Sequence, residues 1–391
     1  MYKSIKLVLT LALFAALTSG GCGGSSTAFV GTVESENERM IQAMTLEEKV
    51  GQLFIIRPEH LTNLVSADYL HYHNSSWDYA LTDEMAETLK QYPVGGFILY
   101  ARNMDTPEQL KQFTADLDSA SEIKPFIAID EEGGRVRRIG RTFSADVAQI
   151  GTMQSIGETG DPQNAYNAAY AIGGYIKEYG FNLNFAPVAD INTNPENIVI
   201  GDRAFGSDPA LVSEMVSAYL DGLHAQKIMG TLKHFPGHGD TSSDTHTGYV
   251  AVYKTWDELL QAELIPFMDN FDNTDMIMTA HITMKNVTSD DLPATLSYEI
   301  MTNKLRKELG YTGVLITDSM GMGAIRDNYP NSEAVVMAVE AGNDIVLGAY
   351  DFREAFSAIV SAVKSGRISE ERIDESVRRI FALKFKEEYQ E

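Results

Sequence analysis

The stretch GVLITD, from Gly313 to Asp318, is a short apolar run that ends in a charged residue. A run of this length, bounded by turn-forming or polar residues, is typical of a buried β-strand. Seven further runs share this apolar character, so the sequence predicts eight strands. They are QLFIIR (Gln52 to Arg57), VGGFILY (Val94 to Tyr100), PFIAID (Pro125 to Asp130), NLNFAP (Asn182 to Pro187), MGTLKH (Met229 to His234), DMIMTAH (Asp275 to His281) and NDIVLG (Asn343 to Gly348).

Segments with helical spacing lie between these runs. Three of them are followed by glycine, at Gly180, Gly310 and Gly342, where a residue with positive φ ends a helix. Alternation of strands and helices over about 340 residues predicts an α/β fold, a single (β/α)8 barrel, with a doubly wound open sheet as the alternative. The expected helices are Thr106 to Ala120, Asn164 to Tyr179, Pro209 to Gln226, Asp257 to Phe267, Tyr298 to Leu309, Ser332 to Ala341 and a closing helix from Ser369 to Glu387.

Polar residues end several of the predicted strands. In a barrel of this kind the carboxyl ends of all strands meet at one rim, and active sites are built there. We therefore expect these side chains to converge on one place. They are Arg57, Asp130, Lys233, His234, His281 and Asp318.

The N-terminus has the features of an export signal. Residues 1–22 carry lysines, then the apolar run LVLTLALFAALTSG, then small residues, and the run is short for a membrane span. Cys22 resembles the lipidated cysteine of a bacterial lipoprotein, although Ser19 replaces the usual leucine; ordinary cleavage near Gly20 or Gly24 is the alternative. We expect residues 23–38 to be a flexible tether and 39–391 to be the folded domain of an exported, membrane-anchored monomer.

Composition narrows the functional classes. The chain has 391 residues, 44% of them hydrophobic, which is enough for a large core. Cys22 is the only cysteine, so the fold has no disulfide and no thiolate metal site. A formal net charge of −24 repels phosphate backbones, and nucleic acid is therefore not an expected partner.

Two aspartates at strand ends are candidates for chemistry. A carboxylate such as Asp318 is costly to bury without partners, so it is either a reactive group that faces a pocket or the cap of the next helix. Asp130 holds the same position in PFIAIDEEGGRVRR, and Arg135 and Arg138 follow it. Guanidinium donors beside a carboxylate suit the hydroxyls and carbonyls of a polar ligand, and a surface ion-pair cluster is the alternative.

The loop KHFPGHGDTSSDTHTG, from Lys233 to Gly248, concentrates histidines after the fifth strand. Asp244 and His246 lie two residues apart, so in an extended loop both point the same way. The Asp244 carboxylate can then hold one imidazole nitrogen and leave the other free for proton transfer. The histidine spacing matches none of the common zinc patterns, and we expect no metal and no organic cofactor.

These motifs, together with NFAPVADI and ITDSMGM, resemble the β-N-acetylhexosaminidases of glycoside hydrolase family 3 over roughly residues 40 to 390. The resemblance implies that Asp318 is the nucleophile and that His246, oriented by Asp244, is the acid/base. Asp-Thr-His replaces the family's frequent Asp-Ser-His, and Glu131 replaces its Gln. The resemblance further implies sugar-binding roles for Asp130, Arg138, Arg203, Lys233 and His234.

The implied activity is a retaining exo-β-N-acetylglucosaminidase. It would release terminal N-acetylglucosamine from peptidoglycan fragments or chitin oligosaccharides through a glycosyl-aspartate intermediate. Three alternatives stay open: a β-glucosidase type of hexosidase, a phosphorylase that passes the sugar to phosphate, and a non-catalytic sugar-binding surface lipoprotein. A binding protein needs no nucleophile, so the presence of Asp318, Asp244 and His246 together argues against the last of these.

Overall fold

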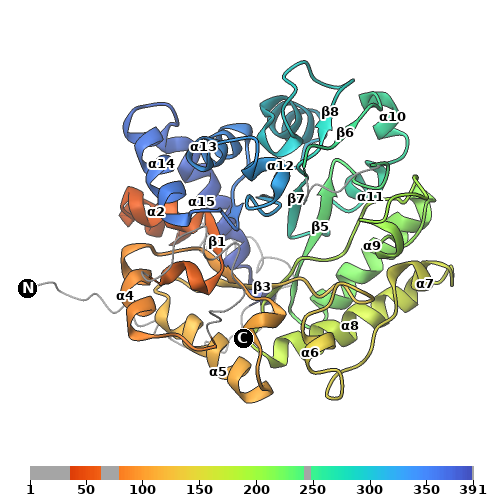
Figure 1. Ribbon diagram of the computed structural model, residues 1–391, viewed down its shortest axis with the longest axis horizontal. Coiled ribbons are helices and arrows are strands. Elements are labelled where there is room, and N and C mark those ends of the chain that lie inside the picture. The colour runs from red at the N-terminus through yellow and green to blue at the C-terminus, as the bar shows by residue number, and fades with distance from the viewer. Residues whose placement is uncertain (1–35, 63–78, 242–247, 390–391) are drawn as a thin grey trace, which may run out of the picture.

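The computed structural model describes residues 36–62, 79–241 and 248–389, and within them the chain forms a (β/α)8 barrel (Figure 1). Eight parallel strands form one sheet in the order β10-β1-β2-β3-β4-β5-β7-β9. A parallel bridge between Ile316 and Ile345 brings its two ends together, so the open-sheet alternative is wrong. The strands are β1 (Phe54–Ile56), β2 (Gly96–Ile98), β3 (Phe126–Ile129), β4 (Leu183–Asn184), β5 (Met229–Phe235), β7 (Met276–Thr279), β9 (Val314–Thr317) and β10 (Val346–Leu347).

All eight predicted strands are confirmed, and each overlaps the apolar run that predicted it. Every residue in these strands is buried. Helices cover the outer face of these parallel strands, and side chains fill the inside of the barrel. Neither face of the sheet is exposed to solvent, which is why the strand sequences are almost continuously apolar. Only β5 extends beyond its run, by Phe235.

Helices surround the sheet as an outer ring (Figure 1). Among the longer ones, α2 precedes β1 and the others come after later strands, and together they cover the outer faces of the sheet. They are α2 (Leu46–Gln52), α4 (Asp83–Gln91), α5 (Pro107–Ala120), α8 (Pro162–Glu178), α9 (Pro209–His224), η5 (Glu299–Glu308), α13 (Asn331–Ala341), α14 (Phe352–Lys364) and α15 (Glu370–Lys384). The short ones are η1 (Pro58–Leu61), η2 (Ala101–Asn103), α6 (Ile139–Thr142), α7 (Met153–Gly157), η3 (Gly201–Arg203), α10 (Trp256–Leu260), α11 (Ile265–Met268), η4 (Ala294–Leu296), α12 (Gly323–Arg326) and η6 (Glu387–Tyr389).

The helix ends follow from local residues. Thr106 caps α5 by accepting a hydrogen bond from the Gln109 backbone N–H, and Ser369 caps α15 in the same way. Gly180, just past α8, has a φ of 82°, and a Cβ there would lie 2.4 Å from the Thr114 hydroxyl oxygen. Only glycine fits this turn, because the conformation and the space both exclude a side chain.

Three segments differ from the sequence-based expectation. The predicted helix from Asp257 to Phe267 is two short helices, α10 and α11, and Pro266 lies at the start of the second. Proline has no N–H to continue a helix across that point. The helix expected from Tyr298 to Leu309 exists as η5, but with π-type hydrogen bonds such as Leu309 N–H to the Lys304 carbonyl. A small parallel sheet of β6 (Ala251–Val252) and β8 (Thr283–Met284) was not expected.

The expected signal, Cys22 and most of the expected tether lie outside the described residues. Among the helices that the structure describes, none combines the length and apolar character needed to cross a bilayer.

Candidate active site

A cavity of about 190 Å³ opens at the carboxyl ends of the barrel strands. It brings together six of the predicted site residues that the structure describes. Asp244 and His246 fall in the segment 242–247, outside the described residues, so the predicted dyad stays a prediction. The predicted residues that line the cavity are Asp130, Arg138, Arg203, Lys233, His234 and Asp318.

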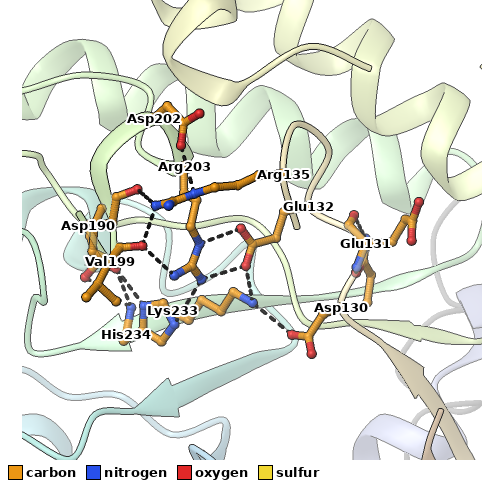
Figure 2. Close-up of polar contacts among 12 residues, drawn as sticks. Asp130, Glu131, Glu132, Arg135, Asp190, Val199, Asp202, Arg203, Lys233 and His234 are labelled. Carbon is orange, nitrogen blue, oxygen red and sulfur yellow. Dashed lines mark hydrogen bonds and ion pairs between the residues drawn. The ribbon is translucent and has the colours of Figure 1, made fainter. Parts of the chain in front are cut away.

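Lys233, at the end of β5, links two carboxylates in the cavity wall (Figure 2). Its ammonium lies 2.6 Å from a Glu132 oxygen and 3.1 Å from an Asp130 oxygen, and its side chain is 2% exposed. Arg138 contacts the other oxygen of Asp130 at 3.3 Å. The lysine is therefore neutralised inside the wall, and the Asp130 carboxylate is held between two cations.

Glu132 is the main residue that sequence reasoning missed. Its carboxylate accepts two hydrogen bonds from the Arg203 guanidinium, at 2.7 and 2.9 Å, in addition to the Lys233 ion pair. It lies one residue past Glu131 in IDEEGG, and that pair of acids was the available signal. What identifies Glu132 is its partners, which come from 71 and 101 residues further along the chain.

The cations of this cluster lower the pKa values of its two carboxylates, Asp130 and Glu132. Burial raises the pKa of Glu132, but Arg203 and Lys233 outweigh that effect and hold the pKa well below its ordinary value. Burial acts on Asp130 in the same direction, and the nearby Lys233 and Arg138 charges again leave its pKa lowered. Both carboxylates are therefore ionised at neutral pH, and they act as acceptors for hydroxyl groups.

Glu131 has a structural role. It lies apart from the ion-pair cluster in Figure 2. Its carboxylate accepts from the backbone N–H groups of Arg138, Ile139 and Gly140 at 2.5, 3.0 and 2.8 Å, and from the Tyr175 hydroxyl at 2.8 Å. Burial raises its pKa. Glu131 thus holds the backbone at the start of α6, which positions Arg138 beside the cavity.

His234 is oriented by a second residue that the sequence did not single out, Asp190. The Asp190 carboxylate lies 2.7 Å from His234 Nδ1 and also accepts from the backbone N–H groups of His234 and His238. A carboxylate accepts only, so Nδ1 carries the proton. Burial raises the pKa of Asp190, yet His234 and the hydrogen bonds leave it lowered. In neutral imidazole, His234 Nε2 is then an acceptor, 3.5 Å from an Arg203 nitrogen.

His238 contributes a neutral imidazole to the same wall. Its ring nitrogen Nδ1 lies 2.8 Å from the Thr241 hydroxyl oxygen, and the side chain is buried. Burial lowers the pKa of His238 to about 4. It therefore stays uncharged through the neutral range. Within the described ranges, no group of three or more His, Cys, Asp or Glu side chains is placed to hold a metal ion.

Asp318 lies directly after β9 and faces the cavity. It is not the cap of the following helix, since α12 starts only at Gly323 and has Met322 at its N-cap position. Its backbone N–H bonds to the Thr279 carbonyl at 3.0 Å, and one of its carboxylate oxygens accepts from the Ser319 N–H at 2.7 Å. These bonds fix the half-buried carboxylate in position at the strand end.

The two remaining strand-end residues lie beside this cavity. His281 is buried, and its ring nitrogens lie 3.0 Å from the Thr295 hydroxyl and 3.0 Å from the Ser319 carbonyl, so it supports the segment after Asp318. Arg57 lines a second cavity next to the first. The expected convergence on one rim is therefore confirmed.

The chain resembles known proteins over most of its length. Residues 45–383 match the family described as "Glycosyl hydrolase family 3 N terminal domain". The chain is 37% identical to Beta-hexosaminidase A of Pseudoalteromonas piscicida over 78% of this chain and 56% of that protein. It is 34% identical to a Beta-hexosaminidase of Stenotrophomonas maltophilia (strain R551-3) over 68% of this chain and 79% of that protein.

A solved structure is similar across the barrel. It is a glycoside hydrolase family 3 beta-N-acetylglucosaminidase from Paenibacillus sp. str. FPU-7, with a TM-score of 0.77 and 37% sequence identity. The alignment covers 88% of this chain and 62% of that one. The matched part of this chain therefore spans between 56% and 79% of the length of these relatives.

Proposed function

Because the chain belongs to glycosyl hydrolase family 3, we propose that it is a retaining exo-β-N-acetylglucosaminidase. It would release terminal N-acetylglucosamine from peptidoglycan fragments or chitin oligosaccharides. One observation carries the proposal: a carboxylate at a strand end, Asp318, lines the cavity together with the charged residues Asp130, Arg138 and Lys233. The names of the relatives, hexosaminidase and acetylglucosaminidase, support the choice of sugar.

The chemistry proceeds in two displacements. Asp318 attacks the anomeric carbon, the glycosidic bond breaks, and His246 gives its proton to the departing oxygen while Asp244 holds the imidazole. The same imidazole then takes a proton from water, whose oxygen attacks the anomeric carbon and releases Asp318. Two inversions give net retention of the β-configuration.

The wall residues would hold the sugar for this reaction. Asp130 is an ionised acceptor for sugar hydroxyls, while Arg138, Lys233 and Arg203 supply donors around it. His234 lines the pocket, and its ring is held in orientation by Asp190. A pocket of about 190 Å³ suits one sugar ring, which is consistent with removal of a single terminal residue.

A paired substrate assay tests the proposal. Purified protein is given p-nitrophenyl β-N-acetylglucosaminide and p-nitrophenyl β-glucoside, alongside the variants Asp318→Asn and His246→Ala. We expect hydrolysis of the N-acetyl substrate alone and at least about a thousandfold lower kcat in Asp318→Asn, because the amide is not a nucleophile. Equal turnover of both substrates would indicate a broader hexosidase. No turnover of either, with N-acetylglucosamine still bound, would indicate a sugar-binding protein.

We also propose that the protein is exported and anchored through a lipid on Cys22. The signal-like order of residues 1–22 supports this. The measurement is mass spectrometry of the protein made in a bacterial host with Cys22 or Cys22→Ser. A diacylglyceryl adduct confined to the Cys22 protein is expected, and an unmodified Cys22 would argue for simple secretion.

A further inference from the structure

Tyr100 lies where the two cavities meet. Tyr100, Ser319 and Met322 line both the first cavity and the adjoining one, which has a volume of about 400 Å³, so these residues form a shared wall. Tyr100 comes two residues after the end of β2, at the rim where the strand ends converge. Among the described residues that line the first cavity, Tyr100 and Ser319 are the two that carry a neutral hydroxyl group.

The backbone of Tyr100 is fixed by the turn that follows it. Its N–H donates to the Asn103 side-chain oxygen at 3.0 Å, and its carbonyl accepts from the Asn103 N–H at 2.8 Å. Asn103 is itself buried, and its side-chain amide donates to Glu59 at 2.9 Å. A buried asparagine therefore fixes the direction in which the Tyr100 side chain leaves the backbone.

Two guanidinium groups pack against the Tyr100 ring. The central carbon atoms of Arg102 and Arg138 lie 4.9 and 5.6 Å from the ring centre, distances at which a cation is attracted to an aromatic ring. Arg138 also contacts an Asp130 oxygen at 3.3 Å. Arg138 therefore connects the Tyr100 ring to the carboxylate of the first cavity, and both side chains are held in place.

The Tyr100 hydroxyl is a hydrogen-bond donor at neutral pH. Burial raises its pKa, the Asp130 charge raises it further, and three nearby arginines only partly oppose these effects, so the pKa is about 12. The phenol therefore keeps its proton. Among the described residues, the hydrogen bonds of Tyr100 are made by its backbone. Polar groups that are largely shielded from water usually have a partner, so this hydroxyl is suited to bind a ligand.

Asp130 supplies a matching acceptor. One of its oxygens contacts the Lys233 ammonium at 3.1 Å (Figure 2), and the other contacts Arg138 at 3.3 Å. A carboxylate oxygen can accept two hydrogen bonds, so each oxygen has room for one from a ligand. A hydroxyl group accepts and donates at once. A single ligand hydroxyl can therefore accept from Tyr100 and donate to Asp130.

We propose that Tyr100 is a further substrate-binding residue, whose hydroxyl donates to a hydroxyl of the terminal sugar that itself donates to Asp130. This rests on the proposed function, in which that sugar occupies the first cavity. In N-acetylglucosamine the first ring carbon is the reacting one and the second carries the acetamido group. The hydroxyl shared by Tyr100 and Asp130 is therefore the one on the third, fourth or sixth carbon.

The test is a cycle of substrate and protein changes. The substrates are p-nitrophenyl β-N-acetylglucosaminide and its 3-deoxy, 4-deoxy and 6-deoxy analogues. The proteins are the full chain, Tyr100→Phe, which removes one oxygen and keeps the ring, and Tyr92→Phe as a matched control. Tyr92 packs against Phe352 and Phe356 and has Arg353 at 5.9 Å from its ring centre, but it lines neither cavity.

The readout is kcat/KM for the parent substrate divided by kcat/KM for each deoxy analogue, measured on one preparation of each protein. Both values scale with the folded fraction, so partial misfolding of a variant leaves the ratio unchanged. We expect Tyr100→Phe to lower kcat/KM for the parent about tenfold, and to lower the ratio about tenfold for one analogue only. For that analogue the hydroxyl that Tyr100 binds is already absent. Tyr92→Phe should keep all three ratios.

A further variant, Asp130→Asn, tests whether the two residues share one hydroxyl. The amide is a weaker acceptor than the carboxylate, so the ratio should fall for the same analogue as in Tyr100→Phe. A fall for a different analogue would show that Tyr100 and Asp130 bind separate hydroxyls, and it would overturn the shared contact.

The remaining outcomes separate this inference from the function on which it rests. Ratios that Tyr100→Phe leaves unchanged for all three analogues would remove the inference and leave the function standing. A loss with chitobiose that is not seen with the p-nitrophenyl substrate would place the Tyr100 contact on the leaving group and overturn the assignment to the terminal sugar. Failure of the unaltered protein to hydrolyse either substrate would remove the proposed function itself.

Discussion

At the scale of single residues, the site depends on a carboxylate shared between cations. Glu132 is 1% exposed and pairs with Arg203 and Lys233, which line the first cavity. The carboxylate of its neighbour Glu131 instead accepts hydrogen bonds from the backbone N–H groups of Arg138 and Ile139. Two adjacent and chemically similar residues thus have different roles, because successive side chains leave the strand end in different directions.

Glu132→Gln should damage both activity and stability. The amide cannot neutralise Lys233 and Arg203, so two buried cations lose their common partner. We expect kcat/KM on p-nitrophenyl β-N-acetylglucosaminide to fall by about a hundredfold and the free energy of unfolding by about 3 kcal/mol. Kinetics and urea denaturation measure the two effects. Glu196→Gln, which changes an exposed acid, is the control, and a variant with near-normal activity would show that Glu132 does not position these cations.

At the scale of elements, helix α15 closes the amino-terminal side of the barrel with a buried lysine. The Lys384 ammonium donates to the Gln52 side-chain oxygen and to the Gly95 carbonyl, both at 2.8 Å. It also lies 4.9 Å from the centre of the Phe126 ring. These contacts join α15 to α2 and to the segment before β2. Burial lowers the pKa of Lys384 to about 7.

The Lys384 pKa predicts a pH-dependent stability. Between about pH 7 and the ordinary lysine value, the unfolded chain holds a proton that the folded protein has lost, so stability rises with pH by up to about 1.4 kcal/mol per unit. Lys384→Met should remove this part of the slope. Urea denaturation at pH 7, 8 and 9 measures it, with Lys364→Met, at an exposed lysine, as the control. Equal slopes in Lys384→Met and the unaltered protein would contradict the assignment.

At the scale of the whole molecule, barrel closure is secured by one buried acid. Asp344 is 0% exposed and precedes β10. It accepts from the Leu315 N–H of β9 at 2.9 Å and pairs with Arg306 at 2.6 Å and Arg379 at 3.0 Å. Burial raises the pKa of Asp344, but the arginine charges outweigh it and the pKa is lowered. One carboxylate therefore joins β9, η5 and α15 at the seam.

Asp344→Asn should weaken the whole domain. Several guanidinium groups would lose their charge partner at once, and we expect a loss of about 3 to 5 kcal/mol in the free energy of unfolding. Because almost all of the buried apolar residues form one cluster, the loss should appear in a single transition that fluorescence and circular dichroism report together. Asp272→Asn, at an exposed position, is the comparison. A variant as stable as the unaltered protein would mean that closure does not depend on this acid.

The sequence by itself determined the class of fold and the side of the fold that carries the site. Eight apolar runs became eight strands because burial on both faces leaves a local, readable pattern. Strand-end residues such as Asp130, Lys233 and Asp318 converged because parallel strands bring their carboxyl ends together. Gly180 and Gly342 ended helices because positive φ is a local requirement.

Only the tertiary structure decided which residues are partners. Glu132 and Asp190 were missed because their importance comes from Lys233, Arg203 and His234, which are distant in sequence. The second cavity, which Arg57 lines, is likewise assembled from segments after four different strands. Hydrophobic periodicity is a property of a short segment, whereas the pairing of buried charges depends on how segments pack, and no short stretch of sequence contains that information.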